Sequence, residues 1–343
     1  MEYKYKVVVD AFGGDNSPDE IVKGAVIAVN KIDGLKVILT GKEKEIQNLL
    51  EKEQYNKESI EIVNANDVIS NCESPTVAIK QKVDSSLVVA FDILRKSEDV
   101  CGLVSAGSTG AVLTGGFLKL GRMAGVSRPA LAPLLPTLKG TNVLLIDCGA
   151  NMDARPINLC HFALMGSKFM ETLGVKNPRV ALLNVGVEDE KGNALCKKVF
   201  PVLKTLPINF VGNMEARDFL SGDYDVVVTD AFAGNVLLKS SEGAVLMILK
   251  MLKKEIKSSI KASIGAKLFL GKTFKNLKNT FDYGSHGGSL FLGTKKIVVK
   301  SHGSSKAESI YHSIQQVIEA HNAKLIEKMQ DAVQGVNIEI EED

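Results

Sequence analysis

The first candidate for chemistry is a glycine pair between two acidic residues near the start of the chain. In the segment DAFGGDNSP, Gly13 and Gly14 lie between Asp10 and Asp15, and Pro18 marks the start of a helix. Glycine lets the backbone approach a ligand closely, and a helix N-terminus offers free N–H groups with a partial positive charge. The segment therefore predicts an anion site, although its two carboxylates would repel phosphate and fit a ligand hydroxyl or a loop contact equally well.

A second glycine-rich loop, SAGSTGA, offers hydroxyl and backbone N–H groups at one point. It contains Ser105, Gly107, Ser108 and Thr109. The lysine of a P-loop is absent, and no strand is followed by the GxGxxG pattern and acidic residue that a dinucleotide requires. These observations disfavour ATP and NAD, and we expect no cofactor.

A lysine stands out in the third loop, NVGVEDEKGNALCKK. Lys191 lies where this loop leads into a helix, between Asn184 and the pair Gly192 and Asn193. A lysine in this position could neutralise a bound phosphate. An exposed loop lysine without a function would look the same in the sequence, so both interpretations stay open.

Other candidates also follow strand-like runs. Asp230, Asn235 and Lys239 surround one strand-to-helix turn, and His302 lies beside a serine- and glycine-rich helix start. Residues of these types are also common in loops because they form turns and caps, which explains any single loop equally well. The remaining strand-end candidates are Asp147, Asn151 and Asn213.

Metal and nucleophilic-serine chemistry find no support in the sequence. There is no HExxH motif, no EF-hand loop and no paired His/Cys ligands, and the GxSxG elbow is missing. The five cysteines are odd in number and widely spaced, which indicates reduced core thiols. We therefore expect no metal site.

Nine short runs rich in β-branched residues are expected to form the strands that position these loops. Most are continuously apolar, which is typical of strands covered on both faces in a parallel α/β sheet. Loops that follow such strands share one edge of the sheet, where ligands bind. We predict strands within residues 6–12, 36–41, 60–65, 102–107, 142–149, 179–186, 208–213, 225–232 and 296–303.

This pattern predicts one doubly wound, mostly parallel α/β domain over residues 1–331, followed by an acidic tail at 332–343. A division near residue 150 is the alternative, but no linker composition marks it. The domain includes a basic helical segment at 239–281.

Charge and the chain ends restrict partners and location. The net charge of +2 gives little attraction to nucleic acid, so no nucleic-acid partner is expected. The N-terminal sequence lacks the apolar core of a signal peptide, and no run of about 18 apolar residues occurs. We expect a cytoplasmic protein with at most peripheral membrane contact.

The segments VVVDAFGGDNSP, VSAGSTGAVLTGG, RPALAPLLPT, DCGANMDARP, ALLNVGVEDEKGN, NFVGNMEARD, VVVTDAFAGNVLLKSSEG and KSHGSS occur in this order. Together they resemble the phosphate acyltransferases of bacterial phospholipid synthesis, the PlsX family, over about residues 6 to 325. The resemblance implies acyl transfer from acyl carrier protein to inorganic phosphate. It also implies an isocitrate/isopropylmalate-dehydrogenase-like fold, a homodimer, and a downstream glycerol-3-phosphate acyltransferase that uses the acyl phosphate.

This reaction assigns roles to the candidates, because phosphate is already nucleophilic and a thioester is already activated. Lys191 is expected to bind phosphate and Asn235 to bind the oxyanion or thioester carbonyl. The loops at Gly13 and Ser108 would supply further donors, and His302 would protonate the departing thiol.

Three positions depart from the family pattern. Asn16 replaces the usual histidine, Ser285 stands at an acidic position, and Ser289 replaces alanine. These differences bear on substrate preference, or on the assignment itself if the missing acidic group is essential.

The basic segment combines charge with an apolar stripe. Ten lysines lie between residues 239 and 278 against Glu242 and Glu255, and apolar residues recur from Val245 to Ile264 at three- and four-residue spacing. Packing in the core or a dimer, docking of acidic carrier protein, and adsorption to anionic membrane are three interpretations. The lysines expected to make such contacts are Lys250, Lys253, Lys254, Lys257 and Lys261.

Two other functions remain open from the sequence. A short-chain phosphotransacylase would use coenzyme A and the same phosphate site. A non-catalytic acyl-chain-binding scaffold on the membrane is the second alternative, and the changes at Asn16 and Ser285 keep it open.

Overall fold

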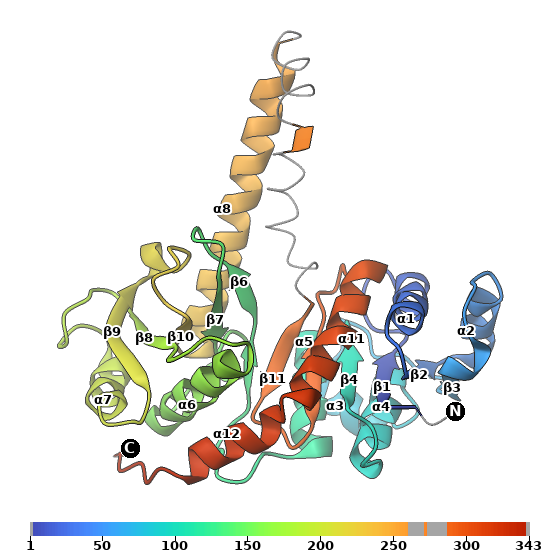
Figure 1. The fold of residues 1–343 in the computed structure, drawn as a ribbon, viewed down its shortest axis with the longest axis horizontal. Helices are drawn as coiled ribbons and strands as arrows, with labels where there is room; N and C mark the ends of the chain where they lie inside the picture. The colour runs from blue at the N-terminus through green and yellow to red at the C-terminus, as the bar shows by residue number, and fades with distance from the viewer. Residues whose placement is uncertain (1–2, 260–270, 273–286, 341–343) are drawn as a thin grey trace.

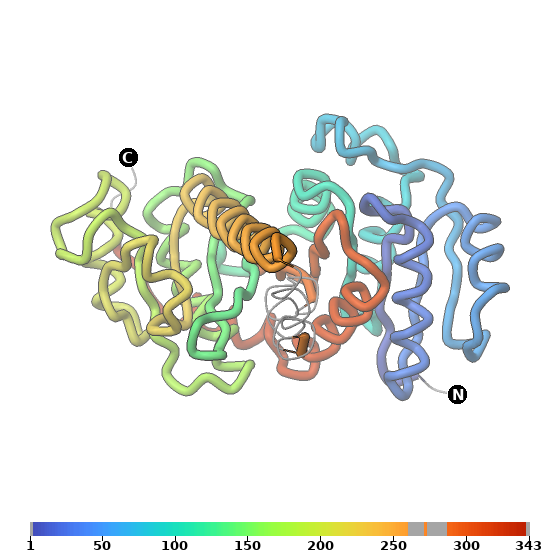
Figure 2. Tube along the Cα trace, turned by 90° about the horizontal axis from the view of Figure 1, so that it is seen from above, coloured from blue at the N-terminus to red at the C-terminus, as the bar shows by residue number. Residues whose placement is uncertain are grey.

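The computed structural model describes residues 3–259, 271–272 and 287–340. Its strands form two mostly parallel sheets that lie side by side (Figures 1 and 2). The first sheet has the order β3-β2-β1-β4-β12-β11-β5, with bounds Ile60–Asn64, Leu35–Gly41, Tyr5–Asp10, Gly102–Ser105, Ile297–Lys300, Ser289–Leu292 and Ala130–Ala132. The second has the order β6-β7-β10-β8-β9, with bounds Leu134–Pro136, Asn142–Ile146, Val226–Val228, Arg179–Asn184 and Asn209–Glu215.

All nine expected strands are present, and the predicted mostly parallel α/β class is confirmed. Three further strands, β5, β6 and β11, were not expected. β6 pairs antiparallel with β7, and β11 pairs antiparallel with both β12 and β5. Each has only three or four residues.

The strands divide between two sheets, whereas we expected one doubly wound sheet. The chain passes from the first sheet to the second between Ala132 and Leu134 and returns between α8 and β11. No linker composition marks the first crossing, because two short strands adjoin it directly. The first sheet is therefore built from both ends of the chain (Figure 1).

Helices cover both faces of the sheets, as continuously apolar strands require. On β1, Val7 and Val9 pack in one core cluster and Val8 packs in the other. The main helices are α1 Asp19–Lys31, α2 Glu43–Leu50, α3 Pro75–Gln81, α4 Ser86–Lys96, α5 Thr109–Gly115, α6 Pro156–Thr172, α7 Ala194–Leu203, α8 Ala231–Lys257, α11 Ala307–Asn322 and α12 Leu325–Gln334. Short helical turns lie at Lys57–Ser59, Gly116–Leu120 and Ala216–Asp218.

The C-terminal region is more ordered than the expected acidic tail. Helix α12 continues to Gln334, past the expected boundary at residue 332. Val336, Ile338 and Ile340 then pack against the core. Polar and acidic residues alternate with these apolar ones. The composition of the segment therefore indicates an acidic tail and does not show that its apolar side chains pack against the core.

Helix α8 projects from the body of the protein (Figure 1). Of the predicted apolar stripe, Ile248 and Leu252 expose 53% and 42% of their surface. Val245, Leu249 and Ile256 are half-buried, and none of these five belongs to either core cluster. The apolar stripe therefore does not pack in the core of this chain over the described part of the helix, and that interpretation is wrong there. Lys261, Ile260 and Ile264 lie outside the described residues.

Within the described ranges, α8 is the one helix long and apolar enough to cross a membrane, with a mean hydropathy of 1.3. Its first turns pack on the body, and its exposed end carries Lys250, Lys253, Lys254 and Lys257. Length and hydropathy alone do not distinguish a span from a helix covered by a partner.

An ion pair joins the starts of two strands in the second sheet. Arg179 donates from Nε and Nη2 to the Asp225 carboxylate, both at 2.9 Å, and its backbone N–H donates to the same group at 2.8 Å. Burial alone would raise the pKa of Asp225, but the hydrogen bonds and charge of Arg179 bring this pKa below its usual value. Two-point contact makes this pair stronger than a typical surface pair.

We expect Asp225→Asn to lower the free energy of unfolding by about 2 kcal/mol at pH 7, because Arg179 is left without its charge partner. A lowered folded-state pKa contributes stability that is fully present above the unfolded pKa of about 4 and is lost as pH falls below it, through the folded-state pKa. The difference between the wild type and the variant, measured by urea denaturation, should therefore stay constant from pH 7 to about pH 5 and shrink below about pH 4.

The matched control is Asp223→Asn, which removes the exposed partner of Lys139. Exposed pairs contribute little. Equal destabilisation by the two variants would show that the Arg179–Asp225 pair contributes no more to the free energy of unfolding than an exposed pair.

Candidate active site

The loops after β1 and β4 meet at a crossing that only glycine permits. Ser105 Oγ donates to Asp10 Oδ2 at 2.7 Å and accepts from the Gly107 N–H at 3.0 Å. A β carbon on Gly13 would lie 2.6 Å from both Asp10 Oδ2 and Gly107 N. The crossing therefore excludes any side chain at position 13.

The loop after β12 joins the same group. The Asp15 N–H donates to the Gly303 carbonyl at 2.8 Å, and Gly14 adopts a φ of 98° beside it. The Asn16 side chain donates to the Ser304 carbonyl at 3.0 Å. The amide that replaces the family histidine therefore holds two loops together.

Asp147 organises the first loop of the second sheet. Its buried carboxylate accepts N–H groups from Leu131, Gly149, Ala150 and Asn151, and also the Asn151 side-chain amide. These bonds occupy both oxygens. Its predicted role in substrate binding is untested, and the observed contacts are those of a residue that shapes the loop.

Helix α8 begins directly against this loop. Asp230 caps it by accepting the Ala233 N–H at 2.8 Å, and the Ala231 N–H donates to the Asn151 carbonyl at 3.0 Å. Gly234 packs so closely that a β carbon there would lie 2.0 Å from the Asp147 carbonyl oxygen. The next residue, Asn235, is half-buried, and its side chain makes no hydrogen bond within the described part of the chain. Its amide is therefore free to meet a substrate.

Two asparagine side chains hold the backbone of the Lys191 loop. Asn184 donates to the Lys191 carbonyl at 3.0 Å, and Asn213 donates to the Glu188 carbonyl at 2.7 Å. Gly192 supplies a φ of 103°, and Asn193 caps α7 by accepting the Cys196 N–H. The loop is therefore fixed, while the Lys191 side chain itself is exposed.

Charged groups from the two sheets gather where α8 passes the loop after β12. Lys239 forms an ion pair with Glu242 at 2.9 Å, and its charge acts on both His302 and Lys300. Partial burial, together with Lys239 and Lys300, lowers the pKa of His302. A largely neutral imidazole at pH 7 is a weaker proton donor, which does not favour its expected role as general acid.

The expected site residues thus form three groups. Asp10, the 13–15 loop, Ser105, Gly107 and His302 lie in the first, with Ser108 capping α5. Asp147, Asn151, Asp230 and Asn235 form the second, and a β carbon on Gly149 would come 3.9 Å from the Thr109 methyl of the first. Asn184, Lys191, Gly192, Asn193 and Asn213 form the third. No hydrogen bond or ion pair joins the Lys191 ammonium to the other groups over residues 3–259, 271–272 and 287–340.

Lys300 is a residue that the sequence analysis did not single out. It ends β12, pairs in register with Ser105, and is only 7% exposed. The sequence does mark its position, because Lys300 directly follows the apolar run IVV and begins the segment KSHGSS. Its burial depends on neighbouring strands and could not be predicted from this pattern.

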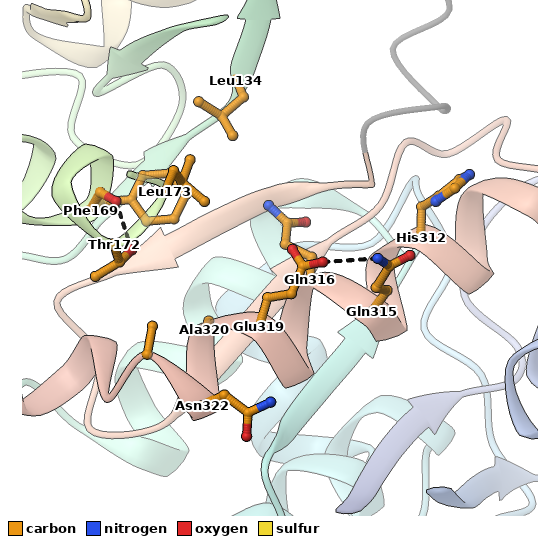
Figure 3. Close-up of a pocket in the computed structure, with 11 residues that line it drawn as sticks. Leu134, Phe169, Thr172, Leu173, His312, Gln315, Gln316, Glu319, Ala320 and Asn322 are labelled. Carbon is orange, nitrogen blue, oxygen red and sulfur yellow. Dashed lines mark hydrogen bonds between the residues drawn. The ribbon is translucent and has the colours of Figure 1, made fainter. Parts of the chain in front are cut away.

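A separate groove of about 520 Å³ lies between α6 and α11 (Figure 3). Phe169, Thr172 and Leu173 line it from the end of α6, and His312 and Gln316 line it from α11. None of the expected site residues lines this groove. Among the described residues, no group of three or more His, Cys, Asp or Glu side chains could hold a metal ion.

The fold resembles those of a phosphotransacetylase and of a 4-hydroxythreonine-4-phosphate dehydrogenase. A phosphotransacetylase from Streptococcus pyogenes matches with a TM-score of 0.62 at 17% identity, covering 94% of each chain. A 4-hydroxythreonine-4-phosphate dehydrogenase from Klebsiella pneumoniae matches with a TM-score of 0.51 at 13% identity, covering 93% of this chain and 99% of that one. At these identities the likeness concerns the fold alone.

Sequence comparison identifies the family. The sequence model described as "Fatty acid synthesis protein" matches residues 5–328. Phosphate acyltransferase from Clostridium acetobutylicum is 43% identical over 332 residues, covering 96% of this chain and 99% of that one. The Bacillus cereus phosphate acyltransferase is 45% identical over 316 residues, covering 92% and 94%. The chain belongs to the phosphate acyltransferase family, which confirms the predicted enzyme class and acyl transfer to phosphate.

Proposed function

We propose that this enzyme takes its long-chain acyl group from the thioester of acyl carrier protein. A phosphate oxygen attacks the thioester carbonyl carbon, the C–S bond breaks, and acyl phosphate forms. The proton of hydrogen phosphate ends on the released thiol, so no redox partner or cofactor is needed. The observation that carries the proposal is that two of the donor-rich loop groups adjoin each other where the projecting basic helix α8 begins.

The three groups suit different parts of this reaction. Asn235 offers an unpaired amide near the N-terminal end of α8, where it can stabilise the oxyanion that develops on the carbonyl oxygen. Lys191 offers an exposed ammonium on a rigid loop, which suits a phosphate anion. The backbone of the Gly13 loop and the Ser108–Thr109 helix start offer N–H donors.

The lysines of α8 support acyl carrier protein as the acyl donor. The exposed end of this helix carries Lys250, Lys253, Lys254 and Lys257 over two turns, with Glu255 as the acidic residue among them. An acidic carrier protein would be attracted to this surface, whereas coenzyme A is small and needs a nucleotide pocket. Turnover of palmitoyl carrier protein, measured with and without phosphate by hydroxylamine trapping, tests the proposal. Faster turnover of a coenzyme A thioester would favour the short-chain phosphotransacylase.

The same helix is the proposed contact for a homodimer. Its apolar face is exposed in the single chain, and covering it with a second copy would remove that surface from water. We also propose a cytoplasmic location with peripheral contact to anionic membrane through the lysines. Close to the membrane, the reactive acyl phosphate could pass to a glycerol-3-phosphate acyltransferase.

Reversing charge on this helix distinguishes the two partners. We expect Lys253→Glu combined with Lys257→Glu to raise the KM for acyl carrier protein severalfold, or to weaken binding to anionic vesicles, with the dimer intact. Both contacts should weaken with salt, since the Debye length is about 8 Å at physiological ionic strength. An effect on carrier-protein docking changes the KM in an assay without lipid, whereas an effect on membrane binding is seen only when vesicles are present.

The control is Lys52→Glu combined with Lys57→Glu, which makes the same charge change at exposed positions near β3. If the α8 variant matched this control in both assays at low salt, these lysines would be only a solvated surface.

A further inference from the structure

Lys300 is a buried lysine at the centre of the first sheet. It ends β12 between β4 and β11, opposite Ser105 on one side and Ser289 on the other. Lysine is almost never buried to this degree unless its charge is paired, because removing an ammonium from water is costly. The surroundings of Lys300 must therefore account for its position.

No carboxylate forms an ion pair with Lys300 within the described ranges. Its Nζ donates to the Ser301 carbonyl. Asp10, on the strand beyond β4, already accepts from Ser105 and from the Phe12 N–H. Asp15, an exposed residue next to Gly13 and Gly14, lies within electrostatic reach. The buried ammonium thus has one neutral hydrogen-bond partner and, within the described ranges, no ion pair, while the charges of Asp15 and Asp10 act on it.

Further positive groups lie around it. The charge of Lys239, from α8, acts on Lys300, and both lysines act on His302. Burial, followed by Lys239, lowers the pKa of Lys300 to about 8, while Asp15 and Asp10 oppose this shift. Lys239 is already paired with Glu242 at 2.9 Å. It lies on α8, which follows the second sheet, whereas Lys300 ends a strand of the first sheet, so the effect of one charge on the other depends on the tertiary structure.

We infer that Lys300 binds the phosphate substrate of the acyl transfer. The loops at Gly13 and Gly303 adjoin it, because Ser105 pairs with Lys300 in register and has its hydroxyl 3.0 Å from the would-be β carbon of Gly13, and because the Asp15 N–H donates to the Gly303 carbonyl. The inference rests on the activity proposed above and extends it by naming a residue for phosphate.

A purely structural role makes a different prediction. If Lys300 only balanced Asp10 and Asp15, removing it would lower stability without affecting phosphate more than the acyl donor. The phosphodiester in the prosthetic group of a carrier protein is a second source of the same anion chemistry. Separate KM values for phosphate and for the acyl donor distinguish these cases.

The test compares Lys300→Met, Lys300→Arg and the control Lys296→Met. Lys296 precedes the same strand at its other end, where its ammonium donates to the Ser97 carbonyl at 3.3 Å. We expect Lys300→Met to raise the KM for phosphate about 10- to 100-fold, the usual effect of losing a charged hydrogen bond, and to change the KM for the donor little. Lys300→Arg should restore much of the loss. A rise only in the donor KM, or no rise in a folded variant, would overturn the inference.

The pH profile provides a second readout that does not need Lys300→Met to fold. In the wild type, kcat/KM for phosphate should fall as pH rises through about 8, because Lys300 loses its charge. In Lys300→Arg this fall should move to higher pH, since guanidinium stays charged. Both enzymes share the titration of phosphate and the same neighbours, Asp10, Asp15, Lys239, Glu242 and His302. Identical profiles would contradict the inference.

A binding measurement separates this inference from the proposed reaction. Inorganic phosphate should raise the Tm of the wild type and of Lys296→Met but not of Lys300→Met, because a ligand stabilises only the state that binds it. If the wild type showed no turnover but kept this pattern, the proposed donor would be wrong and the phosphate site would stand. Equal Tm shifts in all three proteins would exclude Lys300 as a phosphate ligand.

Discussion

Replacing Lys191 with alanine should lower kcat/KM for phosphate by about 100-fold or more, the scale found when one charge-stabilising donor is removed. The side chain is exposed and its loop is held by Asn184 and Asn213 through the backbone, so the fold and dimer should persist. Raised phosphate should partly restore the rate. Steady-state kinetics at limiting and saturating phosphate measure both effects.

The control for this change is Lys197→Ala, which removes an exposed lysine from α7 in the same region. Its rate should stay near that of the wild type. A folded Lys191→Ala enzyme with near-normal turnover at limiting phosphate would remove Lys191 from the mechanism.

The largest structural effect is expected from Gly234→Ala. The added β carbon would lie 2.0 Å from the Asp147 carbonyl oxygen and 2.9 Å from the Thr229 methyl, and neither the buried backbone nor β10 can move freely. Overpacking of this kind costs about 1–3 kcal/mol or more. Helix α8 must shift, and Asn235 shifts with it. A displacement of about 1 Å at a reacting group can cost about 100-fold in rate.

The same helix provides a matched control. Gly243 has nothing within 4 Å of its would-be β carbon, so Gly243→Ala should be neutral or should stabilise the helix by up to about 1 kcal/mol. Thermal unfolding and kcat of the two variants test the comparison. Similar stability and activity in both would show that the close approach at Gly234 does not position α8.

Much of the local structure could be predicted from sequence. The nine apolar runs became strands because burial on both faces leaves a continuous signal within a few residues. Ser108, Asn193 and Asp230 cap the helices that follow them, as short polar side chains commonly do. These features depend on neighbours in the chain.

The missed features depend on distant partners. β5, β6 and β11 are too short to show a pattern, and each forms because another strand offers unpaired backbone groups. The division into two sheets has the same origin. Ser285 lies outside the described residues, and Ser289 lies in β11 opposite Lys300.

The sequence by itself determined the family, the reaction class and which loops follow strands. Only the tertiary structure decided which polar groups already form hydrogen bonds within the protein. Asp147 and Asn184 have their hydrogen bonds satisfied within the protein, whereas Asn235 remains unpaired and Lys300 is buried without an ion pair in the described part of the chain. The physical reason is that hydrogen bonding and desolvation depend on every group nearby, and most of those groups come from distant parts of the sequence.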